Sequence, residues 1–316
     1  MPDTDIDIKR VAVVGTGVIG ASWAAYFLAR GLTVNATDPA PRAQERLIEA
    51  VLKHWPTLVE SGLSAGASLD NLIFYEKLER ALESVQFVQE NGPERADLKL
   101  ALFERMDAAL DKNVIIASSS SGLLMSDVQA ACRHPERVVL GHPFNPPHLI
   151  PLVEVIGGKR TSPETIQRAL DFYRAIGKRP INPKKEVKGH IANRLQAALW
   201  REAFHLVAID AASVSDIDDA IAYGPGLRWA VMGPFANLHL SGGEGGMRHL
   251  LDHLGAPIES WWNDLGTPVL TPELKQKVID GIDAELINRS DARITAERDE
   301  LILAMLRAKA AASAIP

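Results

Sequence analysis

The sequence contains a single cysteine, Cys132, among 316 residues. This count excludes an intramolecular disulfide framework and is typical of proteins from a reducing compartment. Long apolar runs are also missing, since none approaches the roughly 18 residues that a membrane-spanning helix needs. The first nine residues are acidic and lack the apolar core of a signal peptide. We therefore expect a soluble, cytoplasmic protein with no membrane partner.

The sequence also has no excess of positive charge. Its 34 Lys and Arg residues against 40 Asp and Glu residues give a formal net charge of −6. This balance argues against nucleic acid as the main partner, because binding to phosphates requires a basic face. The composition, with 47 % hydrophobic and 23 % charged residues, is typical of a globular protein, and the length corresponds to about two domains.

Short β-rich runs alternate with helical stretches over the first 185 residues. The predicted strands lie at 11–14, 32–37, 72–75, 85–88, 114–117, 138–141 and 152–156. The predicted helices lie at 18–30, 41–61, 94–109, 125–131 and 163–176. This alternation predicts a doubly wound α/β domain, in which a parallel sheet carries helices on both faces.

The pattern becomes entirely helical after Pro183. Helices are predicted at 190–211, from Ser213 or Ser215 onward, at 272–286 and at 294–309, and no strand is predicted after residue 183. We predict an α/β domain over residues 1–187 and an all-α domain over residues 188–316.

A glycine-rich turn follows the first predicted strand and opens the first predicted helix. Its residues are Gly15, Thr16, Gly17, Val18, Ile19 and Gly20. In a Rossmann-type domain, the first glycine permits the tight turn, the second lets a pyrophosphate approach the backbone, and the third lets helix and strand pack. Asp38, 18 residues after Gly20, ends the next strand, where a carboxylate can hold the ribose hydroxyls of NAD and repel the extra phosphate of NADP. Arg42, close behind, could soften that preference.

Two polar segments follow later strands, where open parallel sheets bind ligands. One segment is 117–124, and the other is 141–155. His142 can accept a proton near neutral pH. Glu154 lies in an apolar run and needs a partner to justify its burial, which an imidazole could provide. A metal site at His142 and His148 is not expected, because no cysteine or carboxylate stands at a matching spacing.

On these motifs, the sequence resembles the 3-hydroxyacyl-CoA dehydrogenase superfamily over nearly its whole length. The segments 142–154 and 188–194 are the most specific parts of the resemblance. The resemblance implies NAD-dependent oxidation of an L-3-hydroxy group and a homodimer formed through the helical domain. It implies the catalytic residues Ser121, His142, Glu154 and Asn193. It implies the cofactor residues Asp38, Glu94, Lys99, Ser121 and Asn145.

The helical domain departs from the acyl-CoA enzymes of that superfamily. Arg228 is followed by Trp229, as in the branch that acts on small free 3-hydroxy acids, and the glycine-rich C-terminal segment of the acyl-CoA enzymes is missing. Arg228 could hold a carboxylate bidentately. A trimethylammonium group would need aromatic faces, for which the candidates are Phe144, Trp200, Tyr223, Trp229, Phe235, Trp261 and Trp262. We expect L-carnitine as substrate, with L-gulonate, 3-hydroxybutyryl-CoA or a catalytically silent structural role as alternatives.

Overall fold

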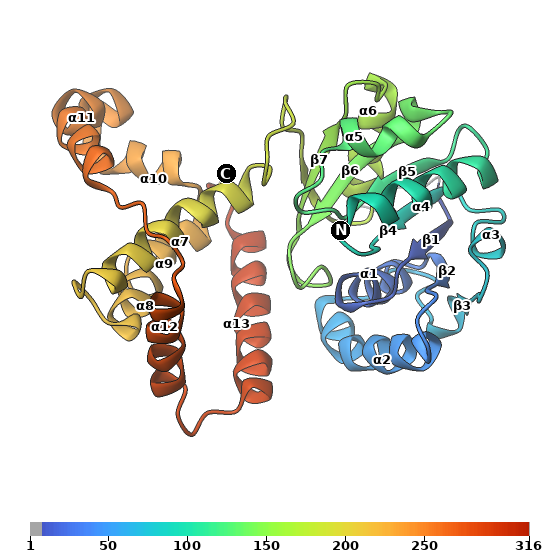
Figure 1. The fold of residues 1–316 in the computed structure, drawn as a ribbon, viewed down its shortest axis with the longest axis horizontal. Helices are drawn as coiled ribbons and strands as arrows, with labels where there is room; N and C mark the ends of the chain where they lie inside the picture. Colours follow the sequence, from blue (N-terminus) through green and yellow to red (C-terminus); the bar gives the residue numbers. More distant parts are fainter. Residues whose placement is uncertain (1–7, 316) are drawn as a thin grey trace. The chain divides into compact units, whose positions relative to one another are not determined.

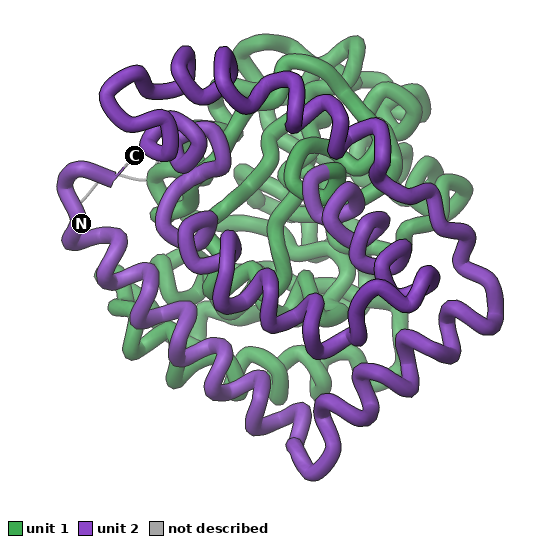
Figure 2. Tube along the Cα trace, turned by 90° about the vertical axis from the view of Figure 1, so that its left-hand side faces the viewer, with its two compact units in different colours: residues 1–194 green, residues 195–316 purple. Residues whose placement is uncertain are grey.

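The computed structural model describes residues 8–315, so the acidic residues 1–7, in which the sequence predicts no signal peptide, lie outside the described residues. The chain forms two compact units that divide between Arg194 and Leu195 (Figure 2). The domain limits of 1–187 and 188–316 stay a prediction. None of the helices in residues 8–315 is long and apolar enough to cross a membrane.

The first unit is built on an eight-stranded sheet in the order β3-β2-β1-β4-β5-β6-β7-β8. Figure 1 labels the strands β1 to β7. The strands are β1 (Arg10–Val14), β2 (Thr33–Thr37), β3 (Leu72–Phe74), β4 (Phe87–Glu90), β5 (Ile115–Ser118), β6 (Val138–Pro143), β7 (Leu152–Gly157) and β8 (Arg179–Ile181). The strand order reverses direction beside β1, which lies between β2 and β4. Ligands of doubly wound sheets bind at this switch point.

The sheet is parallel except between β6 and β7, which pair antiparallel. The prediction of a wholly parallel sheet is wrong at this place. The segment 144–151 that joins the two strands is too short for a crossover helix, because a parallel return needs a dozen or more residues. The short strand β8 was not predicted, since its three residues include a proline and carry no apolar alternation.

Helices cover both faces of the sheet, as the sequence predicts. They are α1 (Val18–Ala29), α2 (Ala43–Ser61), α3 (Leu78–Ala81), α4 (Ala96–Ala109), α5 (Met125–Val128) and α6 (Pro163–Ala175). The side chains of α1, α2 and α6 pack in one core cluster, and those of α3, α4 and α5 pack in another. Short 3-10 helices lie at Leu69–Asn71, Gln129–Ala131 and Pro135–Arg137. The Rossmann-type fold is therefore confirmed for this unit.

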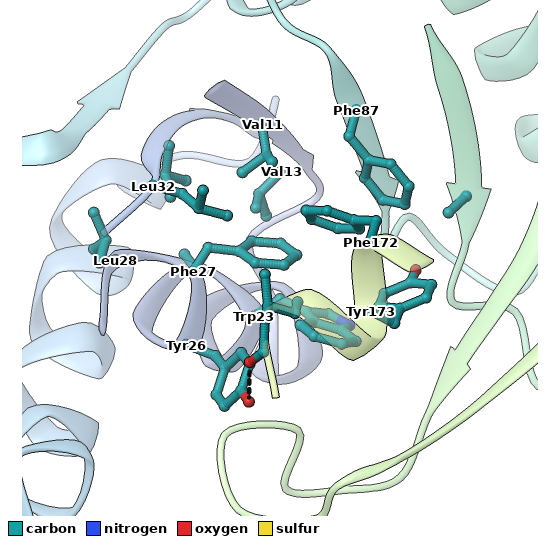
Figure 3. Packing of buried hydrophobic residues seen from close by; sticks show 14 of the residues in the cluster. Val11, Val13, Trp23, Tyr26, Phe27, Leu28, Leu32, Phe87, Phe172 and Tyr173 are labelled. Atoms are coloured by element: carbon teal, nitrogen blue, oxygen red, sulfur yellow. Dashed lines mark hydrogen bonds between the residues drawn. The ribbon is translucent and has the colours of Figure 1, made fainter. Parts of the chain in front are cut away.

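An aromatic cluster fixes α1 against the sheet (Figure 3). Trp23 stacks on Phe27 with ring centroids 5.0 Å apart, and it also contacts Tyr173 of α6. Phe87 of β4 packs on Phe172 at 4.3 Å. Each fully buried large apolar side chain stabilises the fold by about 1.5–3 kcal/mol. The cluster thus holds the N-terminus of α1 at the carboxyl end of β1.

The second unit is all-helical. Its helices are α7 (Ala192–Ala208), which begins in the first unit, α8 (Val214–Ala222), α9 (Pro225–Val231), α10 (Pro234–Ser241), α11 (Gly246–Asp264), α12 (Pro272–Glu285) and α13 (Asp291–Ala311). A 3-10 helix covers Gly243–Gly245. A capping box between Ser213 and Asp216 starts α8, at one of the two predicted positions. Among the described residues, no strand follows Ile181, which confirms the all-α prediction.

Candidate active site

The glycine-rich turn between β1 and α1 has three glycines with different surroundings. Gly15 has a φ of +88°, and a Cβ there would lie 2.8 Å from the backbone of Asn91. A Cβ at Gly20 would collide with the carbonyl oxygen of Gly15. At Gly17, by contrast, a Cβ would meet nothing within 4 Å, and the residue is exposed. The turn therefore leaves open space at its middle glycine, where a bound group can approach the backbone.

The N-terminus of α1 adds hydrogen-bond donors to this space. No side chain caps the helix at Gly17, and its first turn, which begins with Val18 and Ile19, contains no acidic residue. Unpaired N–H groups at a helix N-terminus form an anion site. The open glycine and the uncapped helix together fit the pyrophosphate of a dinucleotide.

Asp38 lies just beyond the end of β2, beside the same turn. Its Oδ2 accepts a hydrogen bond from the backbone N–H of Thr16 at 2.7 Å, and its Oδ1 accepts one from the N–H of Ala40 at 2.8 Å. The half-buried carboxylate is thus held rigidly at the edge of the glycine turn. This is the place that a ribose-binding carboxylate occupies in Rossmann-type domains.

Lys99 and Glu94 follow β4 but differ in what they contact. Lys99 is 2 % exposed, and its ammonium lies 2.8 Å and 2.9 Å from the two carboxylate oxygens of Glu90. Its ammonium is therefore held inside a buried ion pair. The carboxylate of Glu94 accepts hydrogen bonds from the Ser120 hydroxyl at 2.6 Å and from the N–H of Gly122 at 2.7 Å. Their roles toward a cofactor stay predictions.

Burial raises the pKa of the Glu94 carboxyl, but its hydrogen bonds and the charge of Lys99 outweigh this effect and lower the pKa overall. Glu94 is thus a carboxylate at neutral pH. It anchors the loop that carries Ser121.

His142, Glu154 and Ser121 lie together. His142 and Glu154 are direct partners across the antiparallel β6–β7 pair. Nδ1 of His142 lies 2.9 Å from Oε2 of Glu154, and its Nε2 lies 3.1 Å from the hydroxyl of Ser121. The His142 and Glu154 residues are 4 % and 0 % exposed, whereas Ser121 is exposed. The imidazole therefore has a buried carboxylate at Nδ1 and the hydroxyl of an exposed serine at Nε2.

The second oxygen of Glu154 contacts the start of α7. Oε1 accepts hydrogen bonds from the N–H of Ile191 at 2.8 Å and of Ala192 at 3.1 Å. Burial raises the pKa of Glu154, but the hydrogen bonds from His142 and from these two N–H groups lower it overall. The half-buried Asn193 is the next residue, so the segment that carries it is tied to the same carboxylate.

The remaining predicted residues are spread over both units. The Phe144 ring meets the His142 ring edge-on, with centroids 5.2 Å apart, and Asn145 is exposed beside it. Arg228 and Trp229 lie on α9 of the second unit, where both side chains are exposed. Their part in a site stays a prediction.

One residue at the site was not predicted. His190 is 2 % exposed, and its ring centroid lies 5.1 Å from that of His142. Its Nε2 lies 3.2 Å from the carbonyl oxygen of Ser120. His190 stands three residues before Asn193, in the segment that carries the family resemblance. This short separation from Asn193 was the one feature of the sequence that pointed to His190.

The comparisons with known proteins agree with this geometry. Residues 10–187 match the family model of the 3-hydroxyacyl-CoA dehydrogenase NAD binding domain, and residues 189–281 match the model of its C-terminal domain. The chain is 52 % identical to an L-carnitine dehydrogenase of Streptomyces coelicolor, over 96 % of this chain and 95 % of that protein. It is 47 % identical to an L-carnitine dehydrogenase of Pseudomonas putida, over 96 % and 94 %.

Solved structures give the same result. A 5-formyl-3-hydroxy-2-methylpyridine 4-carboxylic acid 5-dehydrogenase superposes with a TM-score of 0.83 at 31 % identity, covering 96 % of this chain and 99 % of that one. The (S)-3-hydroxybutyryl-CoA dehydrogenase of Ralstonia eutropha superposes with a TM-score of 0.66 at 25 % identity, covering 87 % and 95 %. The chain belongs to the 3-hydroxyacyl-CoA dehydrogenase family of NAD-dependent oxidoreductases, and residues 10–187 are its NAD-binding domain.

Proposed function

We propose that this protein oxidises the 3-hydroxyl of L-carnitine to the ketone of 3-dehydrocarnitine, with NAD as acceptor. The observation that carries the proposal is its identity of 44–52 % to eight L-carnitine dehydrogenases over at least 95 % of the chain. The arrangement of Ser121, His142 and Glu154 supports the reaction type, because it offers a base to a secondary alcohol.

His142 acts as the base. With its Nδ1–H donated to Glu154, its Nε2 carries the lone pair and accepts the proton of the 3-hydroxyl. The buried Glu154 carboxylate stabilises the imidazolium that forms. NAD would supply the acceptor for the hydride at C3. Loss of the hydroxyl proton to His142 would then leave the substrate as a ketone.

Ser121 and Asn193 act at the reacting oxygen. The Ser121 hydroxyl lies beside Nε2 of His142 and can hydrogen-bond the substrate oxygen as its charge changes. The two residues before Asn193 are bonded to Glu154 through their backbone N–H groups, and the Asn193 amide can act at the same oxygen.

The residues that would hold the cofactor lie at the carboxyl edge of the sheet. The backbone of Gly15, Gly17, Val18, Ile19 and Gly20 would receive the pyrophosphate, and Asp38 would receive the ribose hydroxyls. Glu94, Ser121 and Asn145 would complete the cofactor site, and Lys99, whose buried ammonium pairs with Glu90 and donates to the Gly92 carbonyl oxygen, would contribute by holding the turn that leads to Glu94.

The substrate carries a carboxylate and a trimethylammonium group. Arg228 can hold the carboxylate through its planar guanidinium. Trp229 in the second unit and Phe144 in the first unit each offer an aromatic face, which a trimethylammonium group prefers because it has no N–H donor. Of the three residues, only Arg228 would distinguish a free acid from an acyl thioester.

The test is NADH formation with L-carnitine, L-gulonate, L-3-hydroxybutyrate and 3-hydroxybutyryl-CoA at equal concentrations. We expect the highest kcat/KM with L-carnitine. Turnover of the CoA thioester alone would show that L-carnitine is not the substrate, and inactivity with all four compounds would overturn the proposed function.

We also propose a cytoplasmic homodimer formed through the second unit. That unit exposes large apolar side chains on several of its helices, including Trp200 at 52 %, Trp261 at 62 %, Trp262 at 65 % and Leu301 at 69 %. Exposed apolar area of this kind marks an interaction surface. Light scattering on the purified protein measures the mass, and a monomer at micromolar concentration would contradict the proposal.

A further inference from the structure

His190 stands in an unusual position for a histidine. It is almost completely buried, its backbone has a φ of +51°, and it follows Gly189, whose φ is +76°. Its Nδ1 has no hydrogen-bond partner among residues 8–315. An unpaired buried acceptor and a left-handed backbone both destabilise a fold. An apolar side chain here would leave no unpaired acceptor. The presence of a histidine therefore indicates a role for its other ring nitrogen, Nε2.

Nε2 of His190 is hydrogen-bonded to the loop that carries Ser121. Nε2 of His190 lies 3.2 Å from the Ser120 carbonyl oxygen, which can only accept, so Nε2 carries the proton and donates. The hydroxyl of Ser120 donates to Glu94 at 2.6 Å. Ser120 is therefore held through its backbone carbonyl and through its side-chain hydroxyl, and the hydroxyl of the next residue lies 3.1 Å from Nε2 of His142.

The other side of His190 is fixed by Glu154. The two residues that follow His190 donate their N–H groups to Oε1 of Glu154, whose Oε2 bonds His142. His190 thus lies between two groups that set the position of His142: the serine loop and the carboxylate.

We propose that His190 is a positioning residue, whose Nε2–H holds the Ser120 carbonyl so that the Ser121 hydroxyl stays within hydrogen-bond distance of His142. The inference rests on the proposed function, in which His142 is the base. His190 itself exchanges no proton with the substrate. Burial and the neighbouring His142 both lower its pKa, which keeps it neutral with its single proton on Nε2.

The test compares two substitutions of different hydrogen-bonding ability. His190→Gln keeps an N–H donor at about the place of Nε2, whereas His190→Phe keeps a ring and loses the donor. The exposed His134 gives the matched control His134→Phe, since its side chain is 45 % exposed and pairs with Glu136. If the Phe variant fails to fold, His190→Leu repeats the test with a smaller apolar side chain.

Two measurements are made on each variant. The first is kcat and KM for L-carnitine across pH 6–9, together with the primary isotope effect from deuterium at C3. The second is amide hydrogen exchange at Gly122 and Leu123, which needs neither substrate nor turnover. We expect His190→Phe to lose roughly 10- to 100-fold in kcat, as a misplacement of about 1 Å does, with KM nearly unchanged. We also expect a larger isotope effect and faster exchange at both amides.

His190→Gln should keep kcat within about fivefold of the wild-type value, with wild-type exchange and the same pH dependence. Wild-type kcat and exchange in His190→Phe would overturn the inference, as would an equal loss in the Gln and Phe variants. If the kcat of His190→Gln no longer fell at low pH, His190 would itself exchange a proton during turnover, and the inference would be wrong. If the wild type does not oxidise L-carnitine, the proposed function fails, but the exchange comparison still decides the positioning role.

Discussion

Glu90 and Lys99 form an ion pair whose side chains are 0 % and 1 % exposed, directly beneath the turn that follows β4. The Glu90 carboxylate also accepts hydrogen bonds from the Ser118 hydroxyl at 2.7 Å and from the N–H of Gly92 at 2.6 Å. This network joins the ends of β4 and β5 below the loops of the candidate site. Loss of this ion pair should therefore lower the free energy of unfolding more than it lowers the rate of the reaction.

We predict that Glu90→Gln destabilises the protein by about 3–5 kcal/mol, because it leaves the ammonium of Lys99 buried without a counter-charge. Urea unfolding measures the change. Glu45→Gln is the control, since its pair with Arg42 is exposed at 58 % and 74 % and should be worth at most about 1 kcal/mol. Equal effects of the two substitutions would contradict the prediction.

Gly17→Ala should separate cofactor binding from folding. The new methyl group meets no protein atom within 4 Å, so the melting temperature should stay near the wild-type value. The methyl group would occupy the space of the pyrophosphate, so we expect the Kd for NAD to rise at least about tenfold, or about 1.4 kcal/mol. Fluorescence titration with NAD measures this. Gly20→Ala serves as the contrast and should unfold the protein, because its Cβ collides with Gly15.

His142→Gln should lower kcat by roughly 10²–10⁴-fold, the range for loss of a positioned base. The Kd for NAD should stay within about twofold, because the glycine turn is untouched. Steady-state kinetics and NAD titration check both values. A variant that turns over normally would remove His142 from the mechanism, and one that cannot bind NAD would make its role structural.

Arg228→Met should raise the KM for L-carnitine more than it changes kcat, if the guanidinium holds the substrate carboxylate. Loss of a charge-assisted bidentate contact costs about 1.5–3 kcal/mol, which is about 10- to 150-fold in KM. The KM for NAD should not change. An unaltered KM for L-carnitine would exclude Arg228 from the substrate site.

His190 should make the protein sensitive to acid. The pKa of His190 lies below the usual 6.5, mainly because of burial. The hydrogen bond to Ser120 and the charges of Glu154 and Glu94 raise the pKa, and His142 lowers it, but burial has the largest effect. Below pH 6.5, the unfolded chain therefore binds a proton that the folded protein does not, and stability falls as the pH falls. Wild type should lose up to about 1.4 kcal/mol per pH unit more than His190→Gln. Urea unfolding at pH 7.5, 6.5 and 5.5 measures this, and parallel curves would contradict the pKa shift.

The glycine turn and its strand–helix context predict the Rossmann-type unit well, because β1 is apolar and β-branched and α1 follows it after a short turn. The reversal at β7 could not be predicted from apolar pattern alone, since the pattern is the same for either strand direction. Helices α9 to α11 were also not predicted. Their sequence is rich in glycine and proline, but Pro225 and Pro234 stand in the first turn, where proline favours a helix.

The pairing of His142 with Glu154 could be predicted, because a carboxylate in an apolar run requires a partner. The contacts of His190 could not. They depend on two consecutive left-handed residues that turn the chain toward Ser120, and local sequence gives no sign of such a turn at a histidine. Likewise, the burial of Lys99 follows from Glu90, whose place at the end of β4 is visible only in the folded sheet.

The antiparallel return of β7 makes the register of a single strand pair critical for the candidate site. Because His142 and Glu154 are opposite each other in a hairpin, a slip of β7 by one residue would turn the carboxylate to the other face of the sheet. The connection 144–151 helps to fix that register, since its His148 is buried and its backbone N–H donates to the hydroxyl of Ser22, so a change in its length would separate the imidazole from its carboxylate.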